Sequence, residues 1–141
     1  MSDLNEALDT VVLIDDDAFF HAACERLIKR TGLVRTMIGF AMAEEALEFL
    51  ARPDNPAIDV IFLDINMPRM NGFEFLDAAV ARFGTRFCGM VVVMLTSSVD
   101  PGDMARARAC PVVVEVVTKP LGREQLEDIA TKLKAARRKR A

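Results

Sequence analysis

The sequence predicts an α/β fold in which one parallel sheet is covered by helices on both faces. Short apolar segments alternate with segments of helical periodicity five times along the chain, and only a few residues connect them. Two segments, Ile58 to Asp64 and Met90 to Leu95, are apolar nearly throughout. Such continuous apolar character is expected of strands that are buried on both faces.

The first two strand–helix units are well delimited. Thr10 to Ile14 is a short apolar strand that runs into three acids, and Ala18 to Arg30 has apolar residues at helical spacing. Gly32 suits the end of this helix. Leu33 to Phe40 follows as a less apolar strand, as expected at the edge of a sheet, and Ala43 to Ala51 is the second helix.

The third strand, Ile58 to Asp64, must end before Pro68, because proline cannot continue a central strand. Asp64 is therefore expected at the last position of this strand, where the chain leaves the core. The remaining elements are expected as a helix over Gly72 to Phe83, a strand over Met90 to Leu95, a helix over Pro101 to Ala109, a strand over Val112 to Val117 and a helix over Arg123 to about Arg137.

One domain, residues 1–141, accounts for the whole chain, with a core over about residues 10–136. The basic run at 137–141 is typical of a solvated helix end, with contact to nucleic acid or an acidic membrane as the weaker alternative.

The net charge of −3 does not indicate a nucleic-acid binder. Three dispersed cysteines, without metal or redox spacing, fit a reducing compartment. No secretory signal or membrane-spanning segment is recognisable, so a cytoplasmic location is expected.

Polar side chains stand at the ends of four of the five expected strands. Asp15 and Asp16 follow the first strand, and Asp64 ends the third. Thr96 follows the fourth strand and Lys119 the fifth. Because the carboxyl ends of parallel strands meet at one edge of a sheet, where open sheets bind ligands, we expect these groups to surround one point.

This set of groups suits phosphoryl transfer. Close carboxylates repel each other, which raises carboxyl pKa values unless a cation neutralises them. Oxygen ligands suit a hard ion such as Mg²⁺, which often bridges to phosphate. Lys119 and Thr96 can contact further phosphate oxygens. Asp64 lies centrally among these residues and is the candidate nucleophile that forms an aspartyl phosphate.

Four separate motifs are those of a known family. They are Asp15-Asp16 after Leu13-Ile14, Leu63-Asp64-Ile65-Asn66-Met67-Pro68-Arg69-Met70-Asn71-Gly72, Met94-Leu95-Thr96-Ser97-Ser98, and Thr118-Lys119-Pro120-Leu121. On these motifs the chain resembles a response-regulator receiver domain of two-component signalling, of the stand-alone, chemotaxis-receiver type. The resemblance covers nearly the whole chain, from about Val11 to the last helix.

The resemblance implies a flavodoxin-like, doubly wound sheet of five parallel strands in the order 2-1-3-4-5. It also implies that Asp64 accepts a phosphoryl group from a histidine kinase or a histidine phosphotransfer protein. Thr96 and Lys119 are then expected to contact the phosphoryl group, and the peptide bond between Lys119 and Pro120 is expected to be cis.

For the metal, the resemblance implies Mg²⁺ ligands from four residues. Asp16 and Asp64 are expected to bind the ion directly and Asp15 mainly through water. Asn66 is expected to contribute its backbone carbonyl.

The implied function is a phosphorylation-dependent switch that binds a downstream protein of unknown identity. Such a protein is not an enzyme, apart from phosphotransfer and autodephosphorylation on its own Asp64. One position departs from the family, which usually has an aromatic residue three positions before the lysine, where this chain has Val116. No output domain, such as a DNA-binding domain, is recognisable. Both features favour the alternative of a phosphorelay shuttle that passes the phosphoryl group to a histidine phosphotransfer protein.

Two enzyme classes are less compatible with the sequence. Phosphatases of the haloacid-dehalogenase type also use an aspartate nucleophile at a strand end, but they need a second Asp where this chain has Asn66. A dinucleotide-binding domain needs a glycine-rich turn after the first strand, which is missing.

Other residues near the motifs have simpler interpretations. Asp17 is expected to cap a helix, and Ser98 to lie in a turn, where it could affect water access. His21 is expected on a helix surface, with a supporting role near the acids as the alternative. Arg106 and Arg108 are expected to be solvated, or to lie on a face that binds partners.

Overall fold

Five parallel strands form one sheet in the order β2-β1-β3-β4-β5, which confirms the predicted fold. The structure is a computed structural model that describes residues 8–88, 90–97 and 100–140, and of residues 85, 88 and 134–140 it describes the backbone alone. The strands are β1 (Leu8–Ile14), β2 (Val34–Phe40), β3 (Val60–Asp64), β4 (Val92–Thr96) and β5 (Val113–Thr118). The helices are α1 (Ala18–Thr31), α2 (Ala43–Ala51), α3 (Gly72–Phe83), α4 (Thr85–Cys88), α5 (Pro101–Arg108) and α6 (Arg123–Arg140).

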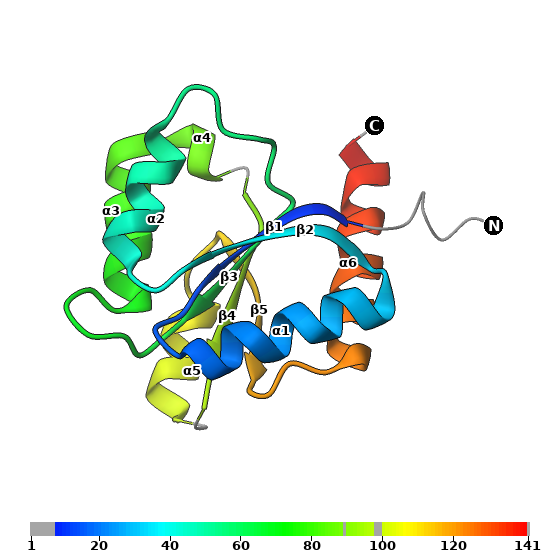
Figure 1. Ribbon diagram of the computed structural model, residues 1–141. Helices are drawn as coiled ribbons and strands as arrows, with labels where there is room; N and C mark the ends of the chain where they lie inside the picture. The colour runs from blue at the N-terminus through cyan, green and yellow to red at the C-terminus, as the bar shows by residue number, and fades with distance from the viewer. Residues whose placement is uncertain (1–7, 89, 98–99, 141) are drawn as a thin grey trace.

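Different helices cover the two faces of the sheet, with α2 and α3 on one side and α1 and α6 on the other (Figure 1). Along β3, Ile61 and Leu63 belong to the layer that includes α2 and α3, whereas Val60 and Phe62 belong to the layer of α1 and α6. Because successive side chains of a strand point to opposite faces, the continuous apolar sequence of β3 fills both layers. This double burial places the end of β3, and so Asp64, at the centre of one sheet edge.

Local capping interactions set the helices that begin next to this edge. The Asp17 carboxylate caps α1 by accepting hydrogen bonds from the backbone N–H groups of Phe19 (2.9 Å) and Phe20 (3.4 Å), as predicted. Asn71 and Glu74 form a reciprocal capping box at the start of α3, with two bonds of 2.9 Å. At the far end of α1, Gly32 adopts a left-handed φ of 69°, which confirms it as the helix stop.

Several predicted boundaries shift. β1 begins at Leu8, two residues earlier than predicted, because the N–H of Leu8 bonds to the carbonyl of Leu33 beside β2. The strands β3 and β4 are shorter than predicted at their starts, and the last helix continues to Arg140. The single-turn helix α4 was not predicted, because four residues are too few to show helical periodicity. Its Phe87 is buried against Phe75, with ring centroids 6.2 Å apart.

The edge strand β5 contains a register irregularity. Val92 of β4 pairs with Val113, but Val93 pairs with Glu115, so Val114 is left over and is mostly exposed. Such a bulge interrupts the free edge of a sheet. Glu115, which interrupts the apolar sequence of β5, pairs its carboxylate with Lys132 of α6 at 2.7 Å.

Gly72 is the point at which α3 meets the end of β3. Its N–H donates to the carbonyl of Ile65 at 2.9 Å. A Cβ atom at this position would lie 2.6 Å from the backbone oxygen of Asp64 and 2.9 Å from Cε of Met94. The side chain of Met94 could move, but the backbone oxygen of Asp64 could not move without shifting the strand end.

We predict that Gly72→Ala lowers the free energy of unfolding by about 1–3 kcal/mol, because the methyl group overpacks the backbone at the end of β3. Urea unfolding measures this change. Gly102→Ala is the matched control, since a Cβ there meets only the Asp100 side chain, at 3.2 Å, and alanine favours the helix. Equal stability of Gly72→Ala and the wild type would contradict the close packing described here.

Candidate functional site

Three carboxylates gather at the carboxyl edge of the sheet. Asp15 and Asp16 follow β1, and Asp64 ends β3, the neighbouring strand. One oxygen from each lies within 4.8 Å of the others. Asp15 and Asp64 are buried, whereas Asp16 is exposed. The cluster predicted from the strand ends is therefore assembled, and three oxygens at this spacing could hold a metal ion.

Asp15 is completely buried, and interactions on both of its carboxylate oxygens hold it in place. Oδ1 accepts a hydrogen bond from the backbone N–H of Asp17 at 2.8 Å. Oδ2 lies 2.6 Å from Nζ of Lys119. The backbone N–H of Asp15 donates to the carbonyl of Phe40 at 3.0 Å, which ties the end of β1 to β2.

Lys119 provides the positive charge of the site. It follows β5, and the peptide bond between Lys119 and Pro120 is cis, as predicted. Its Nζ lies 3.5 Å from Oδ1 of Asp64 and 4.6 Å from the centroid of the Phe20 ring. Burial opposes the charge of Lys119, but hydrogen bonding and attraction from Asp15 and Asp64 raise its pKa above the usual value. The lysine is therefore held charged between the two buried carboxylates.

The environment of Asp64 disfavours its ionised form. Burial, followed by repulsion from Asp15, raises the pKa of Asp64 from 3.8 to about 6, and Asp16 adds a smaller repulsion. Lys119 and the backbone N–H of Asn66, which lies 3.4 Å from Oδ1, act in the opposite direction. One ammonium group does not fully compensate three neighbouring carboxylates, so the site favours a further cation.

Thr96 and Asn66 complete the predicted set. Thr96 is buried at the end of β4, in the strand next to β3. Its carbonyl accepts a hydrogen bond from the N–H of Lys119 at 2.8 Å, which joins the ends of β4 and β5. Asn66 is exposed in the loop that follows Asp64. Ser98 lies outside the described residues.

Two residues at the site make contacts beyond those first expected of them. Asp17 caps α1 as expected, but its N–H also supports Asp15. His21 is half-buried, and its Nε2 lies 2.7 Å from the backbone oxygen of Asp15, which agrees with the alternative expectation of a place near the acids. Its position one helical turn after Asp17 was the only sequence signal for this contact.

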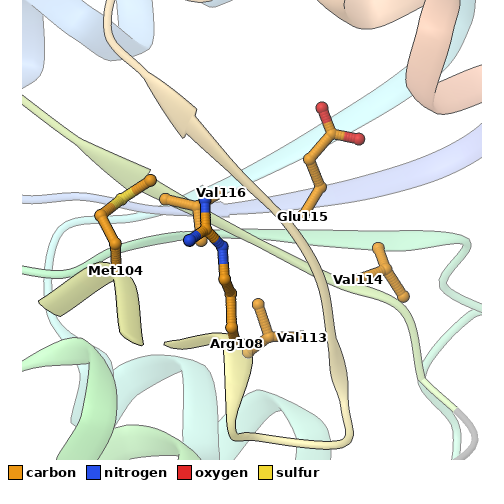
Figure 2. A pocket seen from close by; sticks show the side chains of 6 residues that line it. All are labelled: Met104, Arg108, Val113, Val114, Glu115 and Val116. Carbon is orange, nitrogen blue, oxygen red and sulfur yellow. The ribbon is translucent and has the colours of Figure 1, made fainter. Parts of the chain in front are cut away.

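A hollow of about 340 Å³ lies between α5 and β5. It is lined by Met104, Arg108, Val113, Val114, Glu115 and Val116, whose side chains are drawn in Figure 2. Arg108 is exposed, as expected, and also lines this hollow. Arg106 stacks on Phe73, with the guanidinium carbon 4.3 Å from the ring centroid. The hollow lies beside β5, which Lys119 follows and which pairs with β4, the strand that ends in Thr96.

A family model described as the response regulator receiver domain matches residues 11–131. The chain belongs to this family. The resemblance noted from the four motifs is thereby confirmed, and the protein carries a receiver domain of two-component response regulators.

Solved receiver domains have the same fold. The receiver is 31% identical to a two component response regulator from Cytophaga hutchinsonii, with a TM-score of 0.82 over 92% of this chain and 98% of the other. Chemotaxis protein CheY4 of Vibrio cholerae is 24% identical, with a TM-score of 0.71 over 90% of this chain and 99% of the other, which shows the shared fold.

The curated relatives are longer proteins. A protein-glutamate methylesterase/protein-glutamine glutaminase from Cupriavidus metallidurans is 34% identical over 92% of this chain and 36% of its own length. The sensor histidine kinase CheAY of Helicobacter pylori is 31% identical over 89% of this chain and 15% of its own length. The receiver spans about a third or less of these relatives.

Within the described residues, no helix is both long and apolar enough to span a bilayer.

We predict a pH-dependent stability difference between the wild type and Asp64→Asn in metal-free protein. The raised pKa means that the folded state binds the Asp64 proton more tightly than the unfolded chain does, so wild-type stability falls as the pH rises from about 4 to about 6. Above this window Asp64→Asn should be more stable by about 1–3 kcal/mol. Below pH 3.8 the two proteins should converge.

Urea unfolding at a series of pH values, with a chelator present, measures this difference. Asp54→Asn is the control, because Asp54 is exposed and lies outside the acidic cluster. A difference between Asp64→Asn and the wild type that stays constant from pH 4 to pH 7 would contradict the raised pKa of Asp64.

Proposed function

We propose that this receiver domain is a phosphorylation-controlled switch that accepts a phosphoryl group on Asp64. The observation that carries the proposal is the pairing of a buried carboxylate with a charged lysine, 3.5 Å away, inside a cluster of three acids. In a family that serves two-component signalling, the phosphoryl donor is a histidine kinase or a histidine phosphotransfer protein. We take residues 1–141 as one such domain and expect it to act in the cytoplasm.

The residues present fit a divalent cation. The cluster offers oxygen ligands alone and carries more negative charge than Lys119 balances, which suits a hard ion such as Mg²⁺. Asp15, Asp16 and Asp64 would hold it, with the backbone carbonyl of Asn66. When bound, the ion neutralises charge on the carboxylates and on the phosphoryl oxygens.

The transfer step needs an ionised Asp64. One of its carboxylate oxygens attacks phosphorus as the P–N bond of the phosphohistidine breaks, and the electron pair of that bond stays on the imidazole. The imidazole nitrogen then carries a proton from solvent. Lys119 holds one phosphoryl oxygen through its ammonium group, and the Thr96 hydroxyl donates to another. The same groups stabilise the negative charge of the transition state.

The proposed output is a change at the face formed by α5, β5 and α6. Thr96 ends β4 and Lys119 directly follows β5, so movement of either toward a phosphoryl group acts on the elements beside the hollow. A downstream protein would then bind this face with an affinity that depends on phosphorylation.

A relay role is the second candidate. Val116 lines the hollow in place of the usual aromatic side chain, which limits the conformational signal that β5 can carry. A receiver with a weak output can still pass its phosphoryl group to a histidine phosphotransfer protein. Rapid transfer back to such a protein, with no partner preferring the phosphorylated form, would favour this candidate.

Incubation with acetyl phosphate and Mg²⁺ should add one phosphoryl group to the wild type, measured as intact-protein mass. Asp64→Asn and a metal-free sample should gain none, because each lacks the acceptor or the ion. Asp77→Asn, an exposed acid on α3, is the matched control and should be phosphorylated like the wild type. Phosphorylation of Asp64→Asn would assign the acceptor to another residue.

Beryllofluoride, which mimics a bound phosphoryl group, should shift the backbone amide signals of the wild type at Met104 and Val116 as well as at the strand ends. These residues line the hollow between α5 and β5. Two-dimensional ¹H–¹⁵N NMR measures the shifts, and Asp64→Asn should show none. Shifts confined to residues 64–66 would contradict a conformational output and leave the relay role as the better account.

A further inference from the structure

His21 makes a contact that the proposed phosphoryl chemistry does not use. The ring lies on α1, half-buried, with Nε2 2.7 Å from the backbone oxygen of Asp15. A carbonyl oxygen only accepts hydrogen bonds, so Nε2 must carry the proton and donate. The geometry therefore assigns the tautomer of the ring in the neutral form.

The ring is held from its other side by β2. A Cβ on Gly39 would lie 2.6 Å from Nδ1 of His21 and 2.9 Å from its Cε1. Only a residue without a side chain leaves space for the imidazole in this position. Gly39 pairs with Leu13 in the register between β2 and β1, two residues before Asp15. Thus α1 and β2 together place the imidazole over the end of β1.

The contact completes the restraint of Asp15. Its N–H is bonded to Phe40 and its two carboxylate oxygens contact Asp17 and Lys119, which leaves the carbonyl as the group that His21 holds. That carbonyl belongs to the peptide bond between Asp15 and Asp16. Fixing the plane of this peptide fixes the direction in which the backbone enters Asp16, the exposed acid of the cluster.

We propose that His21 is a positioning residue for the metal site: it orients the Asp15–Asp16 peptide and through it the Asp16 carboxylate, and Gly39 is the space that its ring requires. This role rests on the proposed function, since it presumes that the acidic cluster binds Mg²⁺. It does not require His21 to contact the ion or the phosphoryl group.

The first test is the tautomer, which needs no metal. His21 is the only histidine of the chain, so its imidazole signals need no further assignment. Long-range ¹H–¹⁵N NMR at about pH 8 should show Nε2 protonated and Nδ1 unprotonated. Protonation of Nδ1 alone would overturn the proposal.

The second test is the Mg²⁺ affinity of full-length variants. The chain has no tryptophan or tyrosine, so amide shifts in ¹H–¹⁵N NMR follow the titration better than intrinsic fluorescence. His21→Leu should bind Mg²⁺ about tenfold more weakly, the size of effect typical when a group that orients a metal ligand is lost. His21→Gln should restore most of the affinity, because its amide N–H can donate to the same carbonyl. Ala22→Leu, an exposed change on the same helix, should leave the affinity unchanged.

Gly39→Ala tests the same role without touching the histidine. It should weaken Mg²⁺ binding in the wild type, because the new methyl group displaces the ring. In a His21→Ala background the same change should have little further effect. Independent, additive effects of the two substitutions would overturn the proposal.

The outcomes separate the two levels of inference. If the wild type itself fails to bind Mg²⁺, the proposed function fails, and the role of His21 at a metal site fails with it. If the wild type binds Mg²⁺ and a folded His21→Leu binds it equally well, only the role of His21 is overturned. If His21→Gln loses as much Mg²⁺ affinity as His21→Leu, the hydrogen bond to the Asp15 carbonyl does not set the affinity, and the role of His21 is likewise overturned.

Discussion

The site depends on the balance between three carboxylates and one lysine. Like charges brought this close destabilise a folded chain unless something offsets them. Lys119 does so in part, at 2.6 Å from Asp15 and 3.5 Å from Asp64, but burial and the remaining repulsion from Asp15 still raise the pKa of Asp64. A folded state that carries such an imbalance is stabilised by whatever neutralises it, whether a proton or a cation. The electrostatics of this sheet edge therefore make the stability of the folded state depend on the binding of a proton or a cation.

The architecture produces this imbalance with few residues. Each acid needs only to stand at the end of a buried strand or just after it, because parallel strands end at the same edge. The apolar sequence of β3 fixes where Asp64 stands. The cap at Asp17 starts a helix directly after the first two acids, and the cap at Asn71 starts α3 after the loop that follows Asp64. The residues of this site can therefore be located in the sequence from the expected strand ends. The positions of Asp15, Asp64, Thr96 and Lys119 were predicted in this way.

Other features were not predictable from the sequence, most of them because they depend on contacts between distant segments. The start of β1 at Leu8 depends on a hydrogen bond to Leu33, and α4 is too short for its periodicity to be seen. The bulge at Val114 depends on the register between β4 and β5. Patterns along the chain report burial and periodicity well, but the individual backbone hydrogen bonds also depend on the register in which distant strands pair.

His21 illustrates the same limit at the site. Its spacing on α1 favoured the helix surface and left a supporting role near the acids only as the alternative, and Gly39 in an edge strand suggested nothing about a histidine eighteen residues earlier. His21 and Gly39 come together only when β2 pairs with β1 and α1 packs on the sheet. Asp15 is the result: a buried acid with its amide, its carbonyl and both carboxylate oxygens all in contact with named partners. Such complete restraint suits a residue that keeps the geometry of a site fixed. The residues that can respond to ligands are then Asp16, which is exposed, and Asp64, whose pKa is raised.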